Sequence, residues 1–81
     1  MGSEIPFHDF KRKFECFGVK VFKDGKGGSH WKMKKVIGDR TVVYVFALHK
    51  NKVKHVYLQK ARKRFFLTPN DGVSDEDFSS C

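Results

Sequence analysis

The hydrophobic pattern near the start of the chain is that of a helix over residues 6–17. Phenylalanines recur there at three- and four-residue spacing, which places their rings on one side of a helix. They are Phe7, Phe10, Phe14 and Phe17. Pro6 suits the first helical turn, and Gly18 suits the position just past the end. We therefore expect a helix whose aromatic side packs in the core.

Three short segments rich in apolar and β-branched residues follow, separated by turns that contain glycine. They cover residues 19–22, 29–37 and 41–48. Their order predicts an antiparallel meander of three strands. Within the second segment, alternation places Trp31 on one face of the sheet and His30 on the other. The third segment is apolar on both faces, which is typical of a central or well-covered strand.

A second helical pattern covers residues 53–65. Its apolar side is formed by Tyr57, Leu58, Ala61 and Phe65 and is flanked by Val53. Its opposite side is basic and is formed by Lys60, Arg62, Lys63 and Arg64. The predicted fold class is therefore α+β in the order α-β-β-β-α, with a three-stranded antiparallel sheet and two helices on one face. Residues 1–68 form one domain, and residues 69–81 form an acidic tail that is mobile unless Val73 or Phe78 docks.

The charge distribution divides the chain in the same way. All 17 lysines and arginines and five of the nine acidic residues precede residue 69, so residues 1–68 carry a net charge of +12. The last 13 residues hold the other four acidic residues, a net charge of −4. A basic body this small favours a polyanion as partner, and the tail could fold back on it as a competitor. The alternative is that the charge serves solubility and the tail is solvated.

Length and composition exclude several classes of protein. No apolar run approaches the roughly 18 residues needed to cross a bilayer, so we expect no membrane contact. The chain does not start with a basic region and an apolar stretch, and we expect a cytoplasmic protein. Cys16 and Cys81 are too few for a disulfide-stapled scaffold, and neither has zinc-ligand spacing with a histidine. We expect no metal and no cofactor, and we assign the two cysteines no function.

The segment Gly28-Ser29-His30 is the sharpest candidate for chemistry. A glycine-rich loop lets backbone amides approach a phosphate closely. An imidazole at its rim can accept a proton from a ribose 2′-hydroxyl or donate one to a leaving oxygen. Nearby lysines would bind phosphate, and these are Lys26, Lys32, Lys34 and Lys35. From this chemistry alone, a glycine hairpin with an exposed, idle histidine is the preferred interpretation.

The order and spacing of these segments resemble the HicA family of toxins from bacterial and archaeal toxin–antitoxin systems. In that family a helix ends in glycine and a short strand, as in Phe17-Gly18-Val19. A Gly-Ser/Thr-His signature opens the second strand, as in Gly28-Ser29-His30. A second histidine follows the third strand, where His49 stands, and the last helix has apolar residues at Leu58 and Ala61. The resemblance covers roughly residues 5–67.

Two helices on one face of a three-stranded sheet resemble the architecture of the double-stranded RNA-binding domain. The resemblance to the HicA family implies a toxin that cleaves mRNA without a metal and so inhibits translation. It implies that His30 is catalytic and that a HicB-type antitoxin is the protein partner, and His49 could assist. We expect RNA to be bound by Lys26, Gly28, Ser29, Lys32, Lys34, Lys35, Lys60, Lys63 and Arg64. Two alternatives stay open: a non-catalytic RNA-binding or protein-interaction module on the same fold, and a toxin whose activity has decayed.

Overall fold

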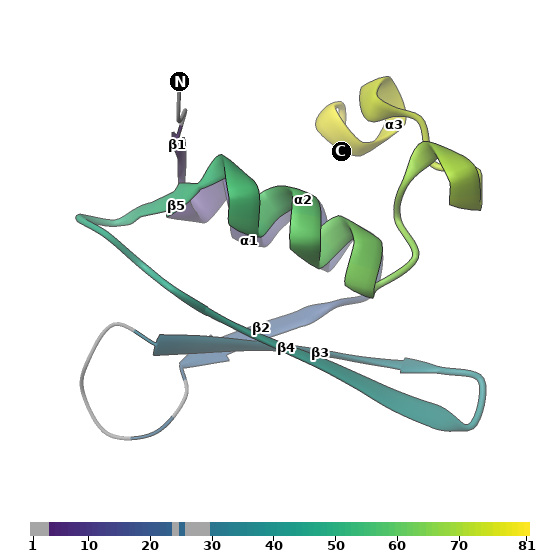
Figure 1. Ribbon diagram of the computed structural model, residues 1–81, viewed down its shortest axis with the longest axis horizontal. Helices are drawn as coiled ribbons and strands as arrows, with labels where there is room; N and C mark the ends of the chain where they lie inside the picture. Colours follow the sequence, from purple (N-terminus) through teal and green to yellow (C-terminus); the bar gives the residue numbers. More distant parts are fainter. Residues whose placement is uncertain (1–3, 24, 26–29) are drawn as a thin grey trace.

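A three-stranded antiparallel sheet with helices on one of its faces forms the body of the protein (Figure 1). The structure is a computed structural model that describes residues 4–23, 25 and 30–81. Its elements are β1 (Glu4–Pro6), α1 (Phe7–Cys16), β2 (Lys20–Lys23), β3 (His30–Ile37), β4 (Arg40–Ala47), β5 (Lys52–Lys54), α2 (His55–Arg64), the 3-10 helix η1 (Pro69–Asp71) and α3 (Asp75–Ser79). The predicted α+β class and the predicted sheet are confirmed.

The sheet has the strand order β2-β3-β4, and both pairs of strands are antiparallel. The central strand is β3, so the prediction of a central or well-covered strand at residues 41–48 was wrong. β4 is an edge strand, and Val45 on it is 44% exposed. The apolar pattern misled because β-branched residues favour extended backbone on exposed sheet faces as well as on covered ones. One side of the sheet therefore presents apolar residues at the surface.

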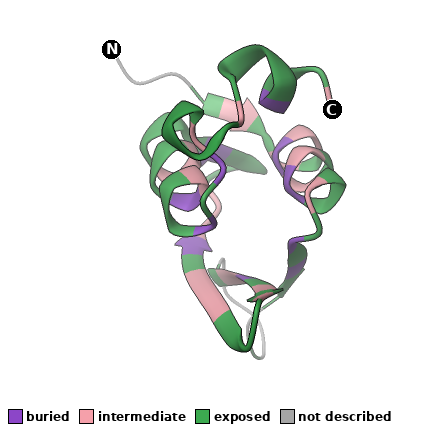
Figure 2. Cartoon of the chain, turned by 90° about the vertical axis from the view of Figure 1, so that its right-hand side faces the viewer, coloured by how far each residue is buried: buried purple, intermediate pink, exposed green. Residues whose placement is uncertain are grey.

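The core lies between the sheet and the two long helices. Phe10 and Phe14 of α1 are fully buried, as their spacing predicts, and so is Ala61 of α2. The ring of Phe10 packs on Phe46 of β4, with 4.8 Å between the ring centroids, and Met33 of β3 is buried in the same cluster. In Figure 2 the buried positions of the helices face inward and the exposed ones face outward. The helices thus cover the inner face of the sheet.

The predicted division of β3 into two faces is confirmed at Trp31 and His30. Trp31 is half-buried against Phe7 of α1, with 4.5 Å between the ring centroids. His30, one residue earlier, is exposed. Trp31 therefore belongs to the side of the sheet that the helices cover, and His30 belongs to the open side.

A second, two-stranded sheet joins the starts of the two long helices, and the sequence pattern did not predict it. Its strands β1 and β5 pair antiparallel and run directly into α1 and α2. Between β4 and β5 the chain reverses at His49 and Lys52, whose backbones exchange hydrogen bonds of 2.9 and 3.0 Å. The two residues between them, Lys50 and Asn51, have φ angles of 53° and 62°. Positive φ at both positions is typical of a type I′ hairpin turn.

The C-terminal segment packs against the helices. Phe78 of α3 is only 2% exposed, and its ring lies 5.0 Å from that of Phe14 and 5.7 Å from that of Phe17. Phe78 thus belongs to the same core cluster as the helices and the sheet. The expectation of a mobile tail depended on whether Phe78 docks, and it does.

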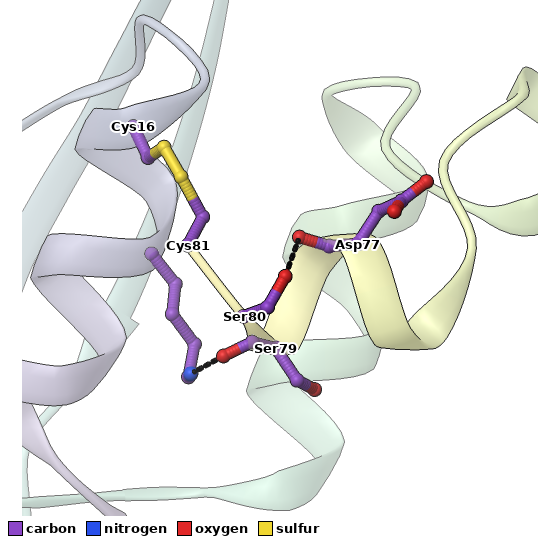
Figure 3. The surroundings of a disulfide bond; sticks show 6 residues. Cys16, Asp77, Ser79, Ser80 and Cys81 are labelled. Carbon is purple, nitrogen blue, oxygen red and sulfur yellow. Dashed lines mark hydrogen bonds between the residues drawn. A yellow bond between two sulfur atoms is a disulfide. The ribbon is translucent and has the colours of Figure 1, made fainter.

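Polar contacts and a disulfide also hold the C-terminal segment. Arg62 of α2 donates to the Asp75 carboxylate at 2.7 Å, and its guanidinium lies 4.5 Å from the Phe78 ring centroid. Cys81 forms a disulfide with Cys16 at the end of α1 (Figure 3). The sequence pattern assigns these cysteines no function, because Cys16 lies on the side of its helix opposite the phenylalanines and Cys81 is the last residue; the bond between them joins positions 65 residues apart. Arg62, which the helical wheel placed on the basic surface, is turned toward the C-terminal segment instead.

Candidate nucleic-acid interface

One side of the sheet faces away from α1 and α2 (Figure 1), and its residues are basic and partly apolar. Strand register and alternation assign its members, which we call the outer sheet face. They are Lys20, Phe22, His30, Lys32, Lys34, Val36, Thr41, Val43, Val45 and Ala47. None of these described residues is acidic. Phe22 and Val36 are 41% and 64% exposed, so apolar surface lies among the lysines.

Two lysines stand directly opposite each other on the outer sheet face. Lys20 of β2 pairs with Lys34 of β3, and like charges at directly opposed positions destabilise an antiparallel pair. A surface hollow of about 640 Å³ lies beside them. It is lined by Gly18, Lys20, Phe22, Lys34, Lys35 and Val36. A bound phosphate would remove the repulsion between these lysines, so the arrangement suits an anionic ligand.

The hollow unites two predicted phosphate-binding residues, Lys34 and Lys35, with two residues that sequence reasoning missed. Lys20 and Phe22 lie on β2, and their alternation with the buried Val21 was the available signal. Alternation alone does not show that these two residues join Lys34, because only the pairing of β2 with β3 brings Lys20 beside Lys34. Lys35 lies between Lys34 and Val36, which belong to the outer sheet face, so its own side chain lies on the other face of the sheet. It reaches the hollow at the edge of the sheet, beside Gly18.

His30 opens β3 on the outer sheet face, opposite Ala47 of β4. Lys32 follows two residues along the same face, roughly 7 Å away along the strand. Within the described part of the chain, no carboxylate pairs with His30. The imidazole is exposed, so a substrate can reach it without any rearrangement of the described residues. The loop residues predicted to bind phosphate beside it, Lys26, Gly28 and Ser29, lie outside the described residues.

His49 has a structural role through its backbone. It lies two residues beyond Ala47, the partner of His30, and its N–H and C=O bond to Lys52 in the hairpin turn. Its side chain is exposed. The position keeps His49 near the same end of the sheet as His30.

A second basic surface lies along α2 and the edge of β4, apart from the outer sheet face. It holds the other three predicted RNA-binding residues, Lys60, Lys63 and Arg64, which are all exposed. Arg64 Nε donates to the backbone oxygen of Val43 at 3.2 Å, so the guanidinium is anchored at the strand edge. Tyr44 lies beside this surface. Burial, and secondarily its interaction with Tyr57, raises the pKa of Tyr44 above its ordinary value of 10.0, and its neutral hydroxyl can donate a hydrogen bond.

The described residues contain neither a cluster of metal ligands nor a membrane-spanning helix. In residues 4–23, 25 and 30–81, no three histidine, cysteine, aspartate or glutamate side chains gather where they could hold a metal ion. No helix in the same ranges is long and apolar enough to cross a membrane.

Comparisons with protein families, curated proteins and solved structures found no match to this chain. The function is therefore inferred from the geometry and chemistry of the two basic surfaces.

Proposed function

We propose that the protein is a HicA-type toxin that cleaves RNA with His30 on the outer sheet face. The observation that carries this proposal is an exposed histidine on a sheet face where the described residues include three lysines and no acid. A cationic face attracts the RNA backbone, and imidazole is the side chain best suited to proton transfer near neutral pH. The helices on one face of a three-stranded sheet are compatible with the proposed relation to the double-stranded RNA-binding domain.

In the proposed reaction, His30 removes the proton from a ribose 2′-hydroxyl. The 2′-oxygen then attacks the adjacent phosphorus, the bond to the 5′-oxygen breaks, and that oxygen takes a proton from His49 or from water. Lys32 and Lys34 would stabilise the negative charge that develops on the phosphoryl oxygens. The expected products are a 2′,3′-cyclic phosphate end and a free 5′-hydroxyl end, with no metal required.

A second candidate function is RNA binding without cleavage on the same face. It is favoured by one observation: no carboxylate among the described residues pairs with His30 to orient its ring. In this case the lysines would still bind RNA, and His30 would add one more contact. The two functions differ in the fate of the RNA and not in its affinity.

A HicB-type antitoxin is the proposed protein partner. The exposed apolar residues of the outer sheet face, Phe22, Val36 and Val45, lie among lysines. A protein that covers them and carries acidic side chains at its rim would bury apolar surface and block access to His30 together. The proposed place of action is the cytoplasm, where the Cys16–Cys81 pair would be reduced.

Inducible expression in a bacterial host tests the proposed function. Wild type should arrest growth and degrade RNA, whereas His30→Ala should do neither at equal soluble level. His55→Ala is the matched control, because His55 is exposed at the start of α2 and lies outside the outer sheet face. Equal toxicity of wild type and His30→Ala would contradict the assignment of His30, and intact RNA with wild type would favour the binding function.

A further inference from the structure

The two long helices end with the same backbone geometry but with different residues at the critical position. At the end of α1, the N–H of Val19 bonds to the carbonyl of Phe14 at 3.1 Å, and Gly18 has a φ of 84°. At the end of α2, the N–H of Leu67 bonds to the carbonyl of Arg62 at 2.8 Å, and Phe66 has a φ of 58°. Both ends thus close with the same six-residue hydrogen bond, and glycine is the usual residue at this left-handed position.

Phe66 is an unfavourable choice for this position, because a bulky side chain in the left-handed region crowds its own backbone. Burial of the ring does not compensate for this strain, since Phe66 remains 57% exposed. Its predecessor Phe65 takes the core position and is 1% exposed. The fold would therefore be more stable with glycine at position 66, and the exposed ring needs another explanation.

Phe66 lines two surface hollows beside the second basic surface. One hollow, of about 370 Å³, is shared with Arg40, Thr41 and Arg64. The other, of about 380 Å³, is shared with Tyr44, Lys60, Lys63 and Arg64. The linings together contain four cationic side chains and no acidic one. In the described part of the chain, no carboxylate pairs with any of these four.

We propose that Phe66 is a stacking platform for an unpaired base of RNA, and that the cations around it bind the flanking phosphates. Any of the four bases can stack on an aromatic ring, so stacking does not depend on the RNA sequence. The backbone of a single strand follows a cationic groove. The site lies at the far end of the β3–β4 hairpin from His30, since Ile37 lines one hollow and is roughly 20 Å along the strand from His30. The inference rests on the proposed function and adds a subsite for nucleotides remote from the cleaved bond.

The linings of the two hollows favour a nucleotide over an acidic peptide. A base can stack on the exposed ring while the neighbouring phosphates lie at Arg40 in one hollow and at Lys63 in the other. A carboxylate side chain has the charge for these cations but no extended π-face to stack on the ring. Tyr44 supplies a hydroxyl group that can bond to a base edge or a ribose. An acidic peptide at this surface is therefore the competing outcome in the test.

The test measures binding of a labelled oligoadenylate of about 12 nucleotides to proteins that all carry His30→Ala, so that the RNA is not cut. Phe66→Ala and Phe66→Gly should each weaken binding by about 5- to 150-fold, the range expected for one stacked base. Phe66→Trp should retain affinity. Phe66→Gly should also raise the urea midpoint of unfolding, so a misfolded protein cannot explain its weaker binding. Lys52→Ala is the control for charge, because Lys52 is exposed on β5 at the other end of α2.

The outcomes separate the inference from the proposed function. A matched oligonucleotide with abasic positions should bind weakly and should not distinguish Phe66→Ala from the parent. If oligoadenylate binds the parent and Phe66→Ala equally, the stacking site is refuted while RNA binding stands. If the parent binds no RNA but binds polyglutamate through Phe66, both the stacking site and the proposed function are refuted.

Discussion

Removal of the disulfide between Cys16 and Cys81 should lower the free energy of unfolding by about 4 kcal/mol. The bond closes a loop across 65 positions of the chain, and the loss of loop-closure entropy in the unfolded state gives about 4.3 kcal/mol for that length at 25 °C. The folded state should change little. Phe78 remains buried, Arg62 remains paired with Asp75, and Lys13 Nζ donates to the Ser79 carbonyl at 2.6 Å without help from the sulfurs.

Urea denaturation of the oxidised protein and of the double variant Cys16→Ser, Cys81→Ser measures the effect. With a slope of about 1 kcal/mol per molar urea for a chain this small, the midpoint should fall by roughly 4 M. Reductant should lower the midpoint of the wild type to that of the double variant and leave the variant unchanged. Midpoints that agree within about 0.5 M would refute the reasoning, because the sulfurs would then place no restraint on the unfolded chain.

Three further perturbations test other parts of the account. Phe78→Ala should cost about 3 kcal/mol of stability in urea denaturation, because its ring packs on Phe14; an unchanged midpoint would mean that α3 is not docked. Lys20→Glu should gain a few tenths of a kcal/mol by pairing with Lys34, yet weaken RNA binding most at low salt; salt-independent weakening would contradict an electrostatic role. Burial raises the pKa of Tyr44 above its ordinary value of 10.0, so the stability that its neutral form contributes is lost as pH rises above about 10. Tyr44→Phe should lack that loss in thermal melts, and parallel losses in both proteins would exclude it.

The sequence predicts best the elements whose hydrophobic period is long enough to be distinctive. The spacing of Phe10 and Phe14 predicts both the helix and its buried side. Alternation along residues 29–37 separates Trp31 from His30 correctly, because successive side chains in a strand point to opposite faces. The two faces of β3 could thus be assigned without coordinates, whereas the contributions of β2 and β4 to those faces could not.

The features that the sequence does not predict depend on contacts between distant residues. The β1–β5 ribbon has strands of three residues, too short for any period to show. Arg62 lies on the basic side of the helical wheel, but Asp75 and Phe78 draw its guanidinium toward the C-terminal segment. Phe66 carries no sequence signal at all, since the left-handed position that it occupies normally holds glycine.

Single-turnover cleavage and equilibrium binding of one RNA, measured with purified wild type and His30→Ala, test the central claim most directly. A general base of this kind contributes about 10²- to 10⁴-fold in rate. We therefore predict that His30→Ala loses at least about 100-fold in cleavage rate while its affinity for the RNA stays within about 3-fold, since Lys20, Lys32 and Lys34 remain. Equal cleavage by the two proteins, or a loss of affinity that accounts for the whole loss of rate, would contradict a catalytic His30.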